Sequence, residues 1–512
     1  MRLFVGLLLS LAVTAQSPAV PVGPGGEAKS EEIARQLDEA RALSLREDPV
    51  LSLQSWQRLK SLVHNDARVL TGLGRSHLQL GRAQLALVYA DAALVEAPTA
   101  SSAQALKIDA LLRCRLFERA LATARDAVSN STSLDAPLLA SYASALFRMQ
   151  QNDEAAAVYR KVLTLDSHHA EAHLRLGSGL LAPCVLEVPA TLRAAVTAEL
   201  ARDRKKAQRL LLGVLLEEPD HAIAHRLLGE SLLAEQAALT MASEAKEFRQ
   251  LAAVLSQPDL THLPVDLFLP GYGQLARERA LVAARPLALF GGYLDRLVTM
   301  GGKHDLLGET ERTTDAPSRR ALRGKRTFDG RVWDDVRGMG GLQAATGIES
   351  LDEAAGFGFD TLAHEVAHQV HLYVFSALER RKIRDLYKVA LDQGRCLDYY
   401  AASNEAEYFA QGVEAFASLA KRPGRESTHG HTRFELLRVD PELYDFIQKV
   451  VSVDPLRDPA RRNQVLAACV AVALRTGRAA DARVAAQLMD QSADAHRLLE
   501  VARQAELRVR VY

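Results

Sequence analysis

Two histidines and a glutamate between Thr361 and His371 have the types and spacing of a metal-binding helix. His364, Glu365 and His368 form an H-E-x-x-H pattern in a run that predicts an amphipathic helix. Residues i and i+4 lie one above the other on a helix, so both imidazoles face one point, where zinc accepts two nitrogens. Glu365 can reach a water at such a metal. The pattern alone arises by chance in roughly a few per cent of chains this long, so other residues must complete the site.

A third protein ligand is needed, because a catalytic zinc site has three and leaves one position open for water. The candidates are His371, Glu405, Glu407 and Glu414. His371 follows His368 by three residues, but three ligands in two turns of one helix cannot easily surround a tetrahedral ion. We therefore expect His371 to support the site or to lie at the surface.

The segment 404–416 predicts a second helix that could supply the third ligand. Its apolar stripe packs into the core, and Glu407 lies one turn in, beside that stripe. A buried carboxylate needs a partner. Asn404 and Glu407 also have the spacing of a capping box, in which the glutamate would bond back to the asparagine. Next to the histidine helix we favour the metal, with the capping box as the alternative.

A longer run of residues around Glu407 resembles a known family. The run is Y-A-A-S-N-E-A-E-Y-F-A from Tyr400 to Ala410, and it places Glu407 39 residues after His368. Together with H-E-x-x-H, it resembles the catalytic domain of the anthrax-lethal-factor-like zinc endopeptidases, which are gluzincins. The resemblance covers about residues 355–450 and implies an α+β zincin-type metallopeptidase domain.

The resemblance also implies a role for each matching residue. His364, His368 and Glu407 would bind one Zn2+ per chain. Glu365 would act as the general base, and Tyr400 would stabilise the oxyanion that forms during hydrolysis. The implied activity is cleavage of peptide bonds in a peptide or protein substrate by an exported zinc endopeptidase.

Some positions differ from the family or leave alternatives open. His371 stands where the family often has an acidic residue, and Gln411 interrupts the family's continuation. Tyr399 competes with its neighbour Tyr400 for the assisting role. Two other functions are consistent with the chain. One is a scaffold for protein interactions with an inactive peptidase-like domain, and the other is a zinc hydrolase that does not act on peptides.

The composition is that of a globular protein with several domains. The 512 residues are 48% hydrophobic and 25% charged, which favours about two to four domains. Lys+Arg and Asp+Glu both total 63, and this balance argues against a nucleic-acid partner. Cys114, Cys184, Cys396 and Cys469 form no C-x-x-C pair, so a cysteine zinc site is disfavoured. They are either oxidised or free.

The N-terminus predicts export. Residues 1–15 combine Met1-Arg2, an apolar run and small residues before a cleavage point after Ala15, as in a secretory signal peptide. Residues 16–30 are rich in Pro and Gly and predict a flexible linker. No later stretch is apolar enough to span a membrane. We therefore expect a periplasmic or extracellular protein.

The fold class predicted for the chain is mostly α. Residues 31–245 show a period of about 34 residues that resembles the tetratricopeptide repeat (TPR), with small residues such as Ala86 and Ala120 at the expected helix crossings. Leu176-Gly177 and Leu228-Gly229 open further units. Such a solenoid could bind a protein partner, or it could simply pack on the next domain.

A zinc metallopeptidase-like domain is expected over residues 256–452, after a stretch of proline and glycine. Short strands are predicted at 293–300 and 341–348, and the second of these could be the sheet edge that takes an extended peptide. Gly338, Gly340 and Gly341 lie just before it. Residues 456–512 are again rich in Ala and Leu and predict C-terminal helical hairpins.

Overall fold

The computed structural model describes most of the chain after the N-terminus. It covers residues 24–511 except 47, 64, 132–133, 184–186, 238–244, 256 and 424–429. The expected signal peptide and Cys184 lie outside the described residues. The expected linker ends earlier than residue 30, because helix α1 (Pro24–Leu45) begins inside it.

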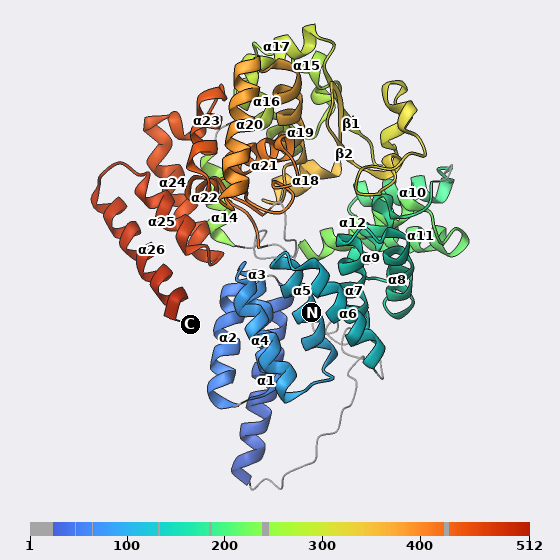
Figure 1. Cartoon of the computed structure of the whole chain (residues 1–512), viewed down its shortest axis with the longest axis vertical. Helices are drawn as coiled ribbons and strands as arrows, with labels where there is room; N and C mark the ends of the chain where they lie inside the picture. The colour runs from blue at the N-terminus through green and yellow to red at the C-terminus, as the bar shows by residue number, and fades with distance from the viewer. Residues whose placement is uncertain are drawn as a thin grey trace.

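An array of stacked helices, called the repeat array below, forms the N-terminal part (Figure 1). Its helices follow one another as α1 (Pro24–Leu45), α2 (Pro49–Leu62), α3 (Ala67–Gln79), α4 (Ala83–Glu96), α5 (Ser101–Arg113), α6 (Phe117–Asn130), α7 (Ala136–Arg148), α8 (Asn152–Leu165), α9 (Ala170–Arg175), the π-turn η1 (Leu176–Leu180), α10 (Ala190–Leu200), α11 (Arg204–Glu217) and α12 (Ala222–Ala237). Ala86 and Ala120 are completely buried where helices cross. The TPR-like fold expected for this part is therefore present.

The turns inside successive pairs repeat one backbone conformation. Gly81, Arg115 and Gln150 each have a positive φ, of 74°, 61° and 59°, at the turn between the two helices of a pair. These positions are 34 and 35 residues apart, so the period predicted from the sequence is confirmed. The glycines of the two Leu-Gly dipeptides lie where two helices cross, as expected for small residues of this repeat. An added Cβ at Gly177 would lie 2.3 Å from the backbone nitrogen of Arg226, so α9 with η1 and α12 cross closely there.

The part that carries the H-E-x-x-H pattern is mainly helical and contains a small sheet. Its elements are α14 (Lys246–Val254), α15 (Val265–Phe268), η2 (Tyr272–Gln274), α16 (Arg277–Leu289), α17 (Gly291–Thr299), β1 (Lys303–Leu307), η3 (Thr313–Asp315), η4 (Pro317–Leu322), η5 (Trp333–Asp335), β2 (Gly338–Met339), β3 (Gln343–Gly347), α18 (Glu349–Ala355), α19 (Thr361–Gln369), η6 (Val370–Val374), α20 (Ala377–Asp392), α21 (Glu405–Ala417), α22 (Arg433–Val439) and α23 (Pro441–Val450). Among the described residues, the three-stranded sheet is the only one.

The sheet confirms one expected strand and corrects two other expectations. β3 forms where a strand was predicted, at 341–348, but it is the central strand, between parallel β1 and antiparallel β2. The segment predicted as a strand at 293–300 is helix α17. Gly291, Leu294 and Leu297 are its buried positions, and this spacing of three is that of a helix face. The α+β character is therefore limited to this sheet.

Helix α19 occupies the centre of the second part. It packs against β3 on one side and against α16, α18 and α21 on the others. Leu362, Ala363, Val366 and Ala367 are completely buried along it. A helix covered on several sides offers rigid attachment for its polar side chains.

The C-terminal helices resemble one more repeat and touch the first ones. They are η7 (Pro455–Arg457), α24 (Pro459–Arg475), α25 (Ala479–Gln487) and α26 (Ala493–Val511). The turn between α24 and α25 has the sequence Gly477-Arg-Ala, and the turn between α3 and α4 has Gly81-Arg-Ala, both with φ of 74° at the glycine. An added Cβ at Gly477 would lie 2.3 Å from Leu80, so these two turns are in direct contact.

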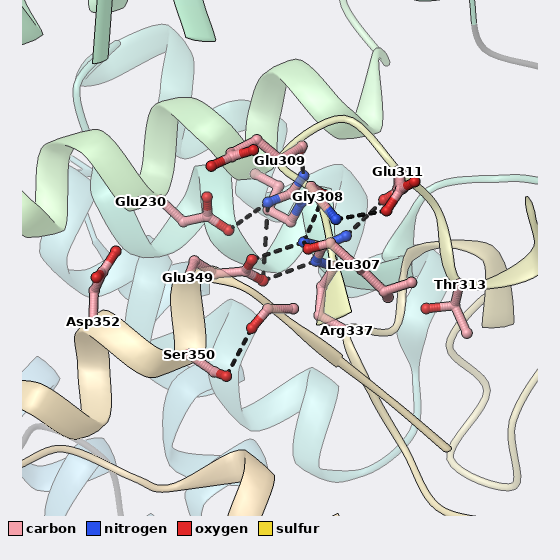
Figure 2. A network of polar contacts seen from close by, with 12 residues as sticks. Glu230, Leu307, Gly308, Glu309, Glu311, Thr313, Arg337, Glu349, Ser350 and Asp352 are labelled. Atoms are coloured by element: carbon pink, nitrogen blue, oxygen red, sulfur yellow. Dashed lines mark hydrogen bonds and ion pairs between the residues drawn. The ribbon is translucent and has the colours of Figure 1, made fainter. Parts of the chain in front are cut away.

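Buried charges join the last helix of the array to the sheet region (Figure 2). Arg226 Nη1 on α12 lies 2.7 Å from Glu230 and 4.0 Å from Glu349, which begins α18. Arg337 donates to both oxygens of Glu349 at 2.8 and 2.7 Å. Burial raises the pKa of Glu230 to about 7, although Arg226 opposes the shift. Burial is the largest influence on the pKa of Glu349 and acts in the same direction, but the hydrogen bond and charge of Arg337 together with the charge of Arg226 outweigh it and lower that pKa to about 2.

Cys114, Cys396 and Cys469 are free thiols, so no disulfide joins the three cysteines that the structure describes. None of the helices within the described residues combines the length and apolarity needed to cross a membrane.

Candidate metal centre

The two histidines of the pattern meet as their spacing predicts. Asp360 caps α19 by accepting a hydrogen bond from the Ala363 amide at 2.9 Å, as expected for an N-cap. His364 Nε2 and His368 Nε2 then lie 3.1 Å apart, one turn from each other. Both rings are buried, with 5% and 7% of their surface exposed.

Glu407 on α21 completes the group. Asn404 caps this helix through its side chain, which accepts from the Ala406 and Glu407 amides at 3.0 Å each. The Glu407 carboxylate is directed to the histidines, with Oε2 3.1 Å from His364 Nε2 and 3.4 Å from His368 Nε2. Asn404 is thus the cap, while the glutamate side chain is directed to the histidines.

The donor atoms of His364, His368 and Glu407 suit a zinc ion. A tetrahedral ion with bonds of about 2.0 Å holds its ligand atoms about 3.3 Å apart, close to the three separations found here. Within the described residues, these three are the group of His, Cys, Asp and Glu placed to hold a metal. Burial acts to raise the pKa of Glu407, but the two nearby histidines together outweigh it and hold that pKa far below its usual value.

Glu365 lies beside the three atoms and against the backbone of β2. Its carboxylate is buried, and Oε2 has no hydrogen-bond partner among the residues that the structure describes. An added Cβ at Gly338 would lie 2.9 Å from Oε1, and one at Gly340 would lie 3.2 Å from Oε2. The glycines let the strand approach this carboxylate, and only Gly341, with φ of 113°, needs a glycine for its backbone conformation. Burial raises the pKa of Glu365, opposed by His364 and His368.

Tyr400 and Tyr399 point to different neighbours. The ring of Tyr400 lies 6.5 Å from the ring of His364. Burial raises its pKa, and the nearby charge of Glu407 adds to the shift. Tyr399 instead packs edge-on against Phe117 of the repeat array, with ring centroids 5.3 Å apart. Of the two tyrosines, Tyr400 is the one beside the candidate metal position.

The other candidate ligands are engaged elsewhere. Glu405 lies 3.1 Å from Arg384 and 3.7 Å from His371. His371 is completely buried beside Phe409, so the expectation that it might lie at the surface was wrong, and burial lowers its pKa to about 4. Glu414 accepts the Asp360 amide at 3.0 Å and pairs with Lys421, which ties the end of α21 to the start of α19.

Two polar residues that hold the histidine helix were missed in the sequence. Gln369 donates to the carbonyls of Lys303 and Leu342 at 3.1 Å each and is 3.0 Å from His304 Nδ1. His304 also contacts Thr346 at 2.8 Å. These bonds attach α19 to both β1 and the segment before β3. The available clue was a further polar residue directly after His368 in a helix that is otherwise expected to be buried.

The comparisons with known proteins find solved structures that match less than half of this chain. No family model matches the chain, and no curated protein matches it. Among similar solved structures, a thermophilic TPR protein of Thermus thermophilus is 17% identical, covers 39% of this chain and 99% of its own, and has a TM-score of 0.28. YrrB, described as a TPR protein with an unusual peptide-binding site, is 19% identical over 38% of this chain and 95% of its own, with a TM-score of 0.23. MamA of Desulfovibrio magneticus RS-1 is 20% identical over 39% and 98%, with a TM-score of 0.25. Such low scores assign no function, and none of these comparisons supports a peptidase.

Proposed function

We propose that this protein is a zinc-dependent peptidase that hydrolyses peptide bonds in a peptide or protein substrate. The observation that carries the proposal is the convergence of His364, His368 and Glu407 on one point at separations of 3.1 to 3.4 Å. These residues would hold one Zn2+ per chain, with Glu365 and Tyr400 beside it.

The chemistry follows from where these side chains lie. A zinc ion at this point supplies Lewis-acid chemistry, which polarises a carbonyl and makes water more acidic. Glu365 is placed to accept a proton from water and to pass it to the leaving amine. Tyr400, next to His364, is placed to donate a hydrogen bond to the oxyanion that forms on the substrate.

Strand β2 is the part of the sheet that we assign to substrate binding. It is an edge strand of the described sheet, and Gly338 within it and Gly340 just after it border Glu365. An extended peptide can add to such an edge through backbone hydrogen bonds. This feature favours a peptide substrate over the small substrate of another type of zinc hydrolase. Because β3 is the central strand, we now assign the peptide-binding edge to β2 instead of β3.

The second candidate is a protein-interaction scaffold with an inactive peptidase-like domain. The stacked helices favour it, because such arrays present extended surfaces of the kind that bind proteins. In that case the chain would bind a partner and hydrolyse nothing.

Residues 1–15 have the pattern of a secretory signal peptide, and on this basis we further propose that the protein is exported to the periplasm or the extracellular medium.

Glu365→Gln and Glu407→Gln separate the two candidates. We expect purified wild-type protein to contain about one zinc per chain and to cleave members of a peptide library. Glu365→Gln should keep the zinc. Its rate of peptide cleavage should fall by roughly 1,000-fold or more, as expected when a general base and its charge are lost. Glu407→Gln should lose zinc affinity, whereas the control Glu405→Gln, two residues earlier and paired with Arg384, should retain it. A zinc-loaded wild type that cleaves no peptide would favour the scaffold.

A further inference from the structure

The loop that carries Tyr400 is attached to the repeat array. Arg148, at the end of α7, donates a hydrogen bond to the Tyr399 hydroxyl, and its guanidinium carbon lies 5.0 Å from the centre of that ring. Phe117, the first residue of α6, contacts the same ring edge-on. Arg115 donates to the Leu397 carbonyl at 3.3 Å. Three residues at the turns of the array thus hold the segment just before Tyr400.

The zinc-bearing part holds the same loop from its other side. The Ala401 amide donates to Asp398 at 2.7 Å, and Tyr387 donates to the Ala402 carbonyl at 2.8 Å. The Ser403 amide donates to the Tyr400 carbonyl at 3.0 Å. Because these bonds do not involve the array, loss of the array contact should loosen the loop without unfolding it.

A second segment near Tyr400 is also fastened to the array. Asn152, the first residue of α8, donates to the Asp329 carbonyl at 2.8 Å, and the Val332 amide donates to the Gly179 carbonyl at 2.8 Å. The charges of Asp329 and Arg331 in this segment are close enough to shift the pKa of the Tyr400 phenol. Two separate segments beside the candidate metal centre therefore depend on the array for their position.

We propose that the repeat array forms part of the active site, with Arg148 as a positioning residue for Tyr400. The rings of Tyr399 and Tyr400 pack edge-on, with centroids 6.4 Å apart, so fixing Tyr399 against the array restricts the position of the Tyr400 ring beside His364. Arg148 both stacks on the ring and donates to the hydroxyl, so it restricts two motions of Tyr399 at once. The catalytic consequence rests on the proposed peptidase function, whereas the placement of the loop does not.

Hydrogen exchange tests the placement directly. In the full-length protein, Arg148→Ala should speed exchange of the Ala401, Ala402 and Ser403 amides about tenfold and leave α19 and the zinc content unchanged. Arg148→Lys should give an intermediate rate, because it keeps the charge but not the planar donor. The control is Arg160→Ala on α8, whose side chain pairs with Asp220 at the surface, and it should change nothing. Unchanged exchange of the three amides in Arg148→Ala would overturn the proposal.

Peptide cleavage tests the catalytic consequence. Arg148→Ala should lower kcat about tenfold with little change in KM, because Tyr400 acts on the oxyanion and not on substrate binding. In a Tyr400→Phe background the same change should have almost no further effect on kcat. An equal loss in both backgrounds would contradict a role through Tyr400. If the wild type cleaves no peptide, the peptidase function fails, and the exchange rates still decide the placement.

Discussion

At the scale of single residues, the position of Glu365 depends on the glycines beside it. Its two carboxylate oxygens lie against Gly338 and Gly340, so backbone and carboxylate are in contact with no side chain between them. This close packing limits the rotation of the Glu365 side chain. Any larger residue at these glycine positions would occupy the space that the carboxylate fills. The strand therefore limits the place of the carboxylate and also forms the edge that we propose for peptide binding.

Gly338→Ala should impair hydrolysis while leaving the metal ligands in place. The added methyl group would lie 2.9 Å from both Glu365 Oε1 and Thr361 Cγ2, so the glutamate or the strand must move. Since a displacement of about 1 Å can cost roughly 100-fold in rate, we expect a loss of about that size in kcat/KM. Zinc content should stay near one per chain. Gly273→Ala, where the added methyl meets nothing within 4 Å, should be neutral. Full activity in Gly338→Ala would contradict the contact.

The residues of the metal centre were largely predictable, and their supports were not. His364 and His368 follow from helical spacing, and Glu407 follows from a second helix with a matching run, because both patterns are local in the sequence. Tyr400 follows from the same run, whereas the contact that fixes its neighbour Tyr399 comes from Arg148, 251 residues away, so no local pattern contains that contact. Gln369 was overlooked for the same reason, since its partners are on distant strands.

At the scale of elements, two buried histidines join α9 to α12. His173 Nδ1 and His225 Nδ1 lie 2.8 Å apart, which leaves room for one proton between them and not for two. Their Nε2 atoms contact the carbonyls of Ser167 and Pro219 at 3.0 and 2.8 Å. Burial lowers the pKa of both His173 and His225 to about 4.

These histidines predict that acid weakens the array. In the unfolded chain the rings take up protons near pH 6.5, whereas the folded pair resists protonation until about pH 4. The unfolded state binds more protons between these values, so the free energy of unfolding should fall as the pH drops through this window. The loss is on the order of 3 kcal/mol for each ring. The midpoint of thermal unfolding should depend less on pH in the double variant His173→Gln/His225→Gln than in the wild type. The control is His168→Gln at an exposed position, which should show the pH dependence of the wild type. An unchanged dependence in the double variant would exclude the pair as its source.

The helices of the array could be predicted from the sequence, whereas one helix and the order of the strands could not. The array was predictable because Ala86, Ala120 and their equivalents recur every 34 residues and pack locally. Helix α17 was mistaken for a strand because a short apolar segment has no clear period, and the burial of Leu294 and Leu297 on one face decides the matter. The three-stranded sheet could not be ordered, since β1 and β3 are parallel and pair across an intervening segment of turns.

At the scale of the molecule, the array and the part that carries the candidate metal centre are joined by charges as well as by the Tyr399 contact. Arg226 is only 4% exposed, and it contacts Glu230, the Glu309 carbonyl and, more distantly, Glu349. Breaking a buried pair leaves the remaining charges without compensation. This junction and Arg148 lie at different helices of the array, so the array is attached at several points along its length.

Arg226→Met should loosen the junction between α12 and the sheet region. Glu230 would lose its close cation while Glu349 keeps Arg337, and we expect a destabilisation of about 3 kcal/mol. The midpoint of thermal unfolding should fall, and limited proteolysis should cut faster near residue 309. The matched control is Arg204→Met on α11, where the pair with Glu199 is about one-third exposed, and little change is expected there. Equal stability of the two variants would show that the junction does not depend on Arg226.

The contact between the first repeats and the C-terminal hairpin bears on how the chain folds. Asp48 pairs with Arg475 across 427 residues of sequence, and Leu80 packs on Gly477 in the same place. A ribosome makes the first of these residues long before the second, so the early repeats must wait with this surface uncovered until Arg475 and Gly477 have emerged. Closing so long a loop is slow, because its entropy must be lost before the contact forms. Helices synthesised about 400 residues later therefore complete the fold of the first ones.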